Sequence, residues 1–235
     1  MAAGNRKGGR VSAASSKAAR TSPKLTAAEA LRDDILNLKR DRILQVAAVL
    51  FYERGYLQTT VDAIAESLGA TKPFVYYHFT SKIDLLVEIC ERGTGEALAA
   101  VEEAASRPGN PAQRFERLVR ALARMALKNH DFVAIYFREE RNLPQKSIDR
   151  IREMRKLINR RLRDVLGEGA ASGHFEINDP GMGALMIAGM SSYAFAWYRD
   201  HGRLKLDEAT DEIVRAALKL VGLPNRASFE ELAAP

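Results

Sequence analysis

Residues 60–79, TVDAIAESLGATKPFVYYHF, decide the fold that this chain can adopt. Thr60 can cap a short helix, because its hydroxyl can accept a hydrogen bond from an orphan backbone N–H, and Gly69 ends that helix. A second short helix follows the turn, with Thr71 as its cap and Pro73 in its first turn, where no intrahelical N–H is needed. Two short helices joined by a glycine turn predict a helix-turn-helix.

Longer helices are predicted on both sides of this segment. Residues 42–54 place apolar side chains on one face and end at Gly55. Ser81 can cap a following helix, with Asp84 at the capping-box position. The apolar residues of the first short helix can pack against 42–54. The N-terminal half of the second short helix is then free to enter a major groove.

The second short helix carries side chains suited to DNA. Lys72 can meet a phosphate or a guanine edge, while Tyr76 and Tyr77 offer hydroxyls and flat apolar faces. Residues 69–82 hold two lysines and no acid, as suits a surface that faces a polyanion. The alternative is a structural role, since Tyr and His near a helix end are often half-buried core residues with a satisfied polar tip.

Residues 41–92 resemble the DNA-binding domain of the TetR family of repressors. The matching positions are Ile43, Ala47, Leu50-Phe51, Gly55-Tyr56, Thr59-Thr60-Val61, Ile64-Ala65, Leu68-Gly69, Thr71 through Phe79, Ser81-Lys82 and Asp84-Leu85-Leu86. Two positions depart from the commonest pattern: Ala70 replaces a usual valine, and Pro73 stands where glycine is frequent. Because proline has no N–H, a phosphate contact by the backbone amide at this position is lost.

The resemblance implies an all-α protein with an N-terminal three-helix helix-turn-helix domain and a C-terminal helical domain. It further implies an Ω-shaped homodimer that binds a palindromic operator and releases it when a small molecule enters the C-terminal domain. The resemblance also implies that Lys82 and Tyr77 contact phosphates and that Lys72, Pro73 and Tyr76 contact base edges. The full set of implied DNA-binding residues is Thr60, Thr71, Lys72, Pro73, Phe74, Tyr76, Tyr77, His78 and Lys82.

The rest of the chain predicts further helices near 112–129, 131–141, 145–166, 181–200 and 207–222. Aromatic and methionine side chains on these helices either line a ligand cavity or form plain core. The candidate ligand-binding residues are Met125, Phe132, Tyr136, Phe137, Met190, Tyr193, Trp197 and Arg155. The uncharged segment 181–198 and the helix 207–222 resemble the family's dimer-forming helices, so we expect dimerisation there.

Residues 150–163 carry seven arginines and lysines. They form either a solvated face or a site for an anionic effector, because guanidinium groups bind phosphates bidentately. The ending Trp197-Tyr198-Arg199 with Gly202 resembles the subgroup of the family that senses acyl-CoA thioesters. An acyl-CoA is therefore one candidate effector, and no cofactor is expected.

Charge is distributed unevenly along the chain. The net charge of +6 comes entirely from residues 1–28, which hold six basic residues and no acid, so that the remainder holds 30 of each sign. A tail of this composition cannot bury enough apolar surface to fold alone. It is either an arm that attracts DNA phosphates or a disordered leader without a role. The predicted organisation is a disordered basic arm (1–28), a DNA-binding domain (29–92), a ligand-binding and dimerisation domain (93–224) and a C-terminal tail (225–235).

Other classes of protein fit the sequence less well. The four histidines are scattered, Cys90 has no neighbouring base, and no metal-ligand cluster, phosphate-binding glycine loop or nucleophile elbow occurs, so we expect no enzyme. The single cysteine excludes a disulfide framework and favours the cytoplasm. Segment 181–198 is short for a membrane span and predicts a buried helix. A DNA-binding protein of the same fold with an architectural or cell-division role, without an effector, remains the alternative.

Deletion of residues 1–28 separates the two interpretations of the basic arm. It removes six positive charges and no predicted core, so the free energy of unfolding should hardly change. If the arm attracts phosphates, affinity for non-specific DNA should fall and its dependence on salt should become less steep. Fluorescence anisotropy with random-sequence duplex at several salt concentrations measures both quantities. An unchanged salt dependence would identify an idle leader.

Overall fold

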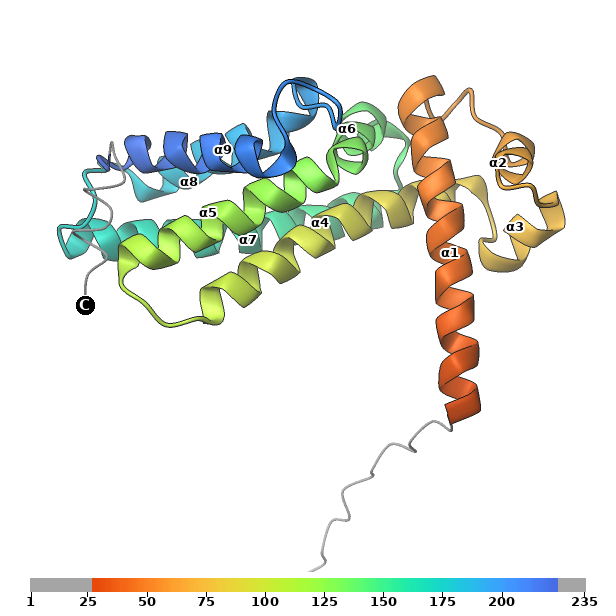
Figure 1. Ribbon diagram of the computed structural model, residues 1–235, viewed down its shortest axis with the longest axis horizontal. Coiled ribbons are helices and arrows are strands. Elements are labelled where there is room, and N and C mark those ends of the chain that lie inside the picture. The colour runs from red at the N-terminus through yellow and green to blue at the C-terminus, as the bar shows by residue number, and fades with distance from the viewer. Residues whose placement is uncertain (1–26, 224–235) are drawn as a thin grey trace, which may run out of the picture. The chain divides into compact units, whose positions relative to one another are not determined.

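The computed structural model describes residues 27–223, and this part of the chain is helical with no strand (Figure 1). The predicted arm, apart from residues 27–28, and the predicted tail lie outside the described residues. The chain divides into two units between Leu38 and Lys39, and the contacts below are those within the second unit. The helices are α1 (Ala27–Arg54), α2 (Val61–Ser67), α3 (Lys72–His78), α4 (Lys82–Ser106), α5 (Pro111–Lys128), α6 (His130–Glu139), α7 (Gln145–Ala171), α8 (Pro180–Ser192) and α9 (Leu206–Leu220), with short 3₁₀ helices η1 (Glu140–Asn142) and η2 (Tyr193–Ala196).

The helix-turn-helix forms where the local signals place it. The Thr60 hydroxyl accepts a hydrogen bond from the backbone N–H of Ala63 at 3.1 Å and caps α2. Gly69 has a φ of 65°, a left-handed conformation that allows the tight turn into α3. Ser81 caps α4 by accepting from the N–H of Asp84 at 3.3 Å. Thr71 occupies the N-cap position of α3, as predicted, but its side chain makes no capping hydrogen bond.

Two hydrophobic clusters hold the described chain together. The first joins α1–α4 and includes Ile43, Phe51, Ile64 and Leu85. Side chains from later in the chain also enter it, and these are Ile135, Tyr136, Leu143 and Ile151. The helices α1–α4 are therefore packed directly against α6 and α7, so a displacement of α6 or α7 changes the support of α1 and α4.

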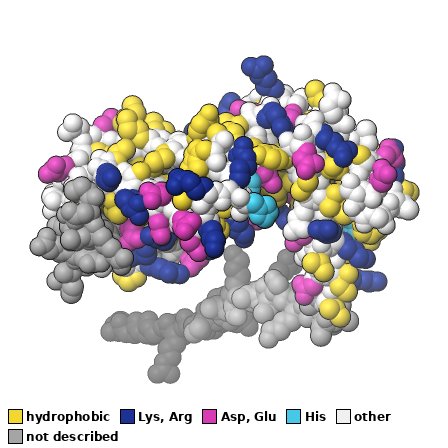
Figure 2. All heavy atoms as spheres, turned by 45° about the horizontal axis from the view of Figure 1, so that its top comes forward, with side chains coloured by type: hydrophobic (Ala, Val, Ile, Leu, Met, Phe, Trp, Pro, Cys, Tyr) yellow, Lys and Arg dark blue, Asp and Glu magenta, His cyan; other side chains and the backbone are white. Residues whose placement is uncertain are grey.

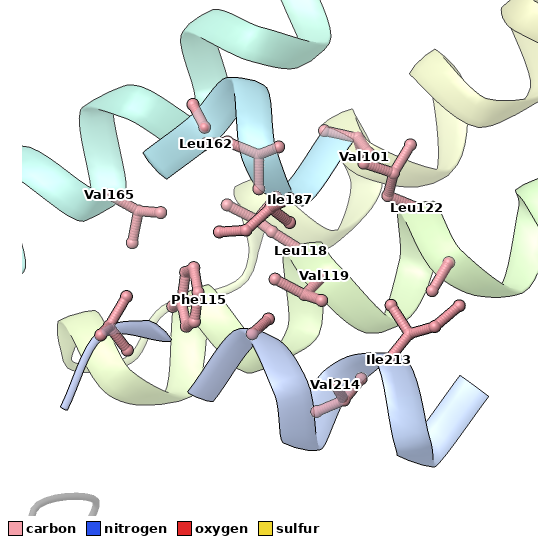
Figure 3. Packing of buried hydrophobic residues seen from close by; sticks show 14 of the residues in the cluster. Val101, Phe115, Leu118, Val119, Leu122, Leu162, Val165, Ile187, Ile213 and Val214 are labelled. Atoms are coloured by element: carbon pink, nitrogen blue, oxygen red, sulfur yellow. The ribbon is translucent and has the colours of Figure 1, made fainter. Parts of the chain in front are cut away.

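The second cluster fills the space among α4, α5, α7, α8 and α9. Figure 3 shows labelled side chains from all five helices pointing toward one another, with Phe115, Leu118 and Val119 of α5 among them. The helix α5 contacts α4, α7, α8 and α9, and its side chains at these contacts are almost fully buried. It is thus the central helix of the C-terminal part.

The segment predicted as one helix over 181–200 is interrupted. The α-helix α8 ends at Ser192, and η2 and an irregular stretch follow. In residues 27–223, no helix has both the length and the apolar character to cross a bilayer. Only part of α8 is buried, because Met182, Leu185 and Met186 are each about half exposed.

Candidate DNA interface and effector pocket

One face of α3 is open to solvent and carries most of the predicted DNA contacts. Tyr77 is 75% exposed and Tyr76 is 43% exposed, while Thr71, Lys72 and Pro73 are exposed as well. Val75 on the opposite face is buried in the α1–α4 cluster and fixes the helix in place. The structure therefore brings these five residues together as a surface that a DNA groove could meet.

Two residues predicted to contact DNA, Phe74 and His78, instead pack against other side chains of the protein. Phe74 packs against the α1–α4 cluster, and the half-buried ring of His78 meets the rings of Phe74 and Tyr77 edge to face, with centroids 5.1 and 5.0 Å away. Burial, followed by the positive charges of Arg40 and Lys39, lowers the pKa of His78. The ring is therefore neutral near pH 7, and its role in this structure is to support the neighbouring tyrosine.

Lys72 and Lys82 differ in their surroundings. The Lys72 ammonium lies at the surface, 2.8 Å from the Asp62 carboxylate, which raises its pKa through the hydrogen bond. Such an exposed pair is worth little in the free protein, so a phosphate can compete for the lysine.

Lys82 is engaged inside the protein. Its ammonium donates to the carbonyl oxygens of Tyr56 and Thr59, both at 2.9 Å, and lies 4.3 Å from the centre of the Tyr56 ring. These contacts fasten the start of α4 to the α1–α2 loop. Loss of operator affinity on substituting Lys82 would therefore not by itself identify a phosphate contact.

The C-terminus of α1 is held by two residues of α6. The Arg138 guanidinium donates to the carbonyl oxygens of Phe51 and of Tyr52, the latter at 2.9 Å. The buried Glu139 carboxylate accepts from the backbone N–H of Tyr56 at 3.2 Å and from Arg138 Nε at 3.1 Å. We call this arrangement the α1 clamp. It adds a hydrogen bond to the Phe51 carbonyl, which also accepts from the backbone N–H of Gly55 at 3.0 Å, and binds the Tyr52 carbonyl in the last turn of α1. No signal in the sequence indicated it.

A small internal cavity of about 60 Å³ lies among α4, α5, α6, α7 and the end of α8. Four of the predicted ligand-binding residues line it: Phe132, Tyr136, Phe137 and Arg155. Its remaining walls come from Cys90, Gly93, Thr94, Ala97, Leu122, Ala126, Val133, Ile158 and Ser192. The cavity is thus mostly apolar with a few polar groups, as ligand sites generally are.

Arg155 is the charged residue of this cavity. Its guanidinium lies 5.5 Å from the centre of the Tyr136 ring and 5.4 Å from that of Phe137. Within residues 27–223 it forms no ion pair with a carboxylate. Burial raises the pKa of Tyr136, whose hydroxyl donates to Glu140 at 3.0 Å. A half-buried cation held by aromatic faces can still bind an anion or a polarised carbonyl.

Cys90, in the wall of the internal cavity, has an unreactive thiol. Burial first, and then the charges of Glu139 and Glu91, raise the pKa of its thiol to about 12. The thiol is therefore protonated at neutral pH, and a protonated thiol is a poor nucleophile.

The other predicted ligand-binding residues lie away from the cavity. Met125 and Met190 pack against the C-terminal cluster, and Tyr193 and Trp197 are 64% and 48% exposed. The basic stretch of α7 is largely paired with acids: Arg150 lies 2.7 Å from Glu91, and Arg161 lies 2.7 Å from Glu102. Of the arginines and lysines between residues 150 and 163, Arg155 is the one that lines the internal cavity.

An apolar strip runs along the outside of α8. It consists of Met182, Leu185 and Met186, with Gly189 beyond them, and continues to Tyr193 at the start of η2. Figure 2 shows patches of hydrophobic side chains on the surface of the C-terminal helices. By contrast, the outer face of α9 is charged, and Asp211 pairs with Arg120 of α5 at 2.5 Å. A strip of this kind is characteristic of an interface with another protein surface.

Comparison with known proteins matches both parts of the chain. Residues 43–89 match the family described as bacterial regulatory proteins, tetR family. Residues 108–221 match the tetracyclin repressor-like C-terminal domain.

Individual relatives agree with these matches. The HTH-type transcriptional repressor KstR2 of Mycobacterium tuberculosis H37Rv is 27% identical over 78% of this chain and 92% of its own. A TetR/AcrR-family regulator from Thermobifida fusca is 32% identical over 77% of this chain and 96% of its own, with a TM-score of 0.61. AibR, solved with isovaleryl coenzyme A and operator DNA, is 26% identical over 76% of this chain and 97% of its own, with a TM-score of 0.63.

Proposed function

Because this chain belongs to the TetR family of DNA-binding transcriptional regulators, we propose that it is a repressor whose operator binding is controlled by a small molecule. The observation that carries the proposal is the α1 clamp beside the internal cavity. Tyr136 and Phe137 line the cavity, and the next two residues of α6 hold the end of α1. A ligand that moves α6 therefore acts on a helix of the DNA-binding domain.

We infer that the working form is a homodimer joined through α8. The exposed apolar strip on this helix supports the inference, because large apolar surfaces on a soluble chain usually meet a partner. A two-fold dimer would present two copies of the α3 face to successive major grooves. This arrangement matches a palindromic operator with half-sites about 34–36 Å apart.

We propose an effector with an apolar body and a polar or anionic group, of which an acyl-CoA is the leading example. The apolar cavity wall and Arg155 support this class, and a related regulator has been solved with isovaleryl coenzyme A. The cavity of about 60 Å³ has to widen to admit such a molecule, since sites for ligands of this kind usually have volumes of about 300–1,000 Å³. The same small volume favours the second candidate, an architectural or cell-division DNA-binding protein without an effector.

Gel-shift titration distinguishes these functions. The full chain should bind a palindromic site, selected from random duplex DNA, in the nanomolar range. Adding acyl-CoAs of increasing chain length should release it, and a difference of about 3 kcal/mol between the two states would weaken binding roughly 150-fold.

Matched free acids and free CoA serve as controls for this titration. Release by the free acids but not by the thioesters would replace the CoA assignment with a simple carboxylate inducer. Tight operator binding that no compound in the panel alters would favour the architectural role.

A further inference from the structure

A surface groove adjoins the internal cavity. It lies between the end of α1, α6 and the η2 segment and has a volume of about 630 Å³. Its walls include Tyr52 and Glu53 of α1, Phe137 and Arg138 of α6, and Phe195 and Arg199. The groove is open to solvent, whereas the cavity lies deeper among the helices.

A single side chain belongs to both spaces. Phe137 lines the cavity and the groove. Its ring stacks on that of Phe195, with centroids 5.4 Å apart and the planes inclined by 24°, and Arg155 lies 5.4 Å from its centre on the cavity side. The ring is 45% exposed, so it can turn toward solvent without leaving a packed core. A rotation of Phe137 would join the two spaces.

Two guanidinium groups, those of Arg138 and Arg199, line the groove together with the carboxylate of Glu53. Arg138 is also paired with the buried Glu139, 3.1 Å from its Nε, so Arg199 is the groove's arginine without an ion pair among the described residues. Arg199 donates to the carbonyl oxygens of Phe195 and Tyr198 at 2.9 and 2.6 Å. The terminal nitrogens of both arginines therefore donate to neutral carbonyl oxygens, while Arg138 Nε donates to the Glu139 carboxylate.

We propose that this groove binds the phosphate-bearing part of an amphipathic effector whose apolar end passes Phe137 into the cavity. The proposal rests on the effector-controlled function proposed above and assigns a second subsite to it. Guanidinium groups bind phosphates through charge-assisted, often bidentate hydrogen bonds, which are stronger than those to a neutral carbonyl.

The subsite also supplies a route to the DNA-binding domain. Arg138 belongs to the α1 clamp, where it holds the carbonyls of Phe51 and Tyr52. A phosphate in the groove competes with those carbonyls for the same guanidinium. Occupancy of the groove therefore loosens the hold on α1, in addition to any displacement of α6 by the apolar end.

Two probes with the same apolar end test the subsite. Octanoyl-CoA carries phosphates, whereas octanoyl-pantetheine keeps the acyl chain and the thioester but is uncharged. Calorimetric titration of the full chain should show that octanoyl-CoA binds at least about tenfold more tightly, with a preference that declines as salt is raised. Arg199→Ala and Arg138→Ala should each reduce this preference severalfold, and Arg199→Lys should retain part of it.

Internal controls separate the possible outcomes. Binding of octanoyl-pantetheine should be unchanged in Arg199→Ala, which shows that the cavity is intact. Arg203→Ala, an equal loss of charge at an exposed position outside the groove, should leave the preference unchanged. Equal affinities of the wild type for the two probes, or an unaltered preference in both Arg199→Ala and Arg138→Ala, would overturn the subsite. Neither result affects the proposed repressor function, which is tested by operator binding without ligand.

Discussion

Replacing Gly189 by arginine is expected to convert the proposed dimer into monomers and to abolish tight operator binding. Gly189 lies within the apolar strip of α8, and a Cβ added there would point into open space, with no atom of another part of the chain within 4 Å. The arginine therefore fits the folded monomer, but it puts a charge into the centre of the proposed interface. A buried charge without a partner costs several kcal/mol, and the two-fold axis places it there twice.

Sedimentation at micromolar concentration and gel shift on the selected operator measure the two effects. A monomer offers one recognition helix instead of two, so operator affinity should fall by more than about 100-fold. Gly167→Arg is the matched control, because a Cβ added at Gly167 also has open space around it and this residue lies on α7. A Gly189→Arg protein that remains dimeric would show that the interface lies elsewhere.

Gly183 shows why the choice of glycine matters for this experiment. It belongs to the same helix, but a side chain there would begin 2.3 Å from Ile177 Cδ1. A substitution at Gly183 would thus disturb the monomer core and could not distinguish loss of the dimer from loss of the fold.

Substitution of the exposed residues Tyr77 and Lys72 of α3 should cause the second large loss of DNA affinity. Tyr77→Ala is expected to weaken binding to all sequences, while Lys72→Ala should mainly reduce the preference for the operator over random DNA. A loss of about 1 kcal/mol per half-site would amount to about 2 kcal/mol for the dimer, which is roughly a 30-fold loss of affinity. Anisotropy titrations at fixed salt, on operator and on random duplex, give both quantities.

The folded state should tolerate these changes. Tyr77 is 75% exposed, so Tyr77→Ala should change the free energy of unfolding by no more than about 0.5 kcal/mol. Tyr77→Phe keeps the ring and removes the hydroxyl, and thus separates a hydrogen bond to phosphate from apolar contact. If Lys72→Ala and Tyr77→Ala both leave operator affinity unaltered, α3 is not the recognition helix.

The helix-turn-helix was predictable because its signals are local. A cap such as Thr60 and a turn glycine such as Gly69 act on backbone groups within a few residues, so the sequence alone carries them. The spacing of apolar residues likewise indicated that Ile64 and Ala65 face the core. The Thr71 side chain makes no capping hydrogen bond, and this was not predictable, because the sequence shows that a hydroxyl can reach an N–H but not that it does.

The effector site was harder to predict because it depends on which helices meet. The helix α8 carries apolar or small residues on every side, so its sequence could not tell that Tyr193 would be exposed. The pairing of Arg150 with Glu91 and the contact of Glu139 with Tyr56 join residues far apart in the chain. Such pairs follow from tertiary packing, which no local pattern encodes.

The α1 clamp has a consequence for how this regulator can diversify. The hydrogen bonds that Arg138 and Glu139 make to the DNA-binding domain go to main-chain atoms, namely two carbonyls and one N–H. Every residue type other than proline presents these atoms in the same way. Mutations that alter the side chains of α2 and α3, and so retarget the protein to a new operator, therefore do not change the groups that the clamp holds. A new operator sequence can therefore evolve on α2 and α3 without a compensating change in Arg138 or Glu139.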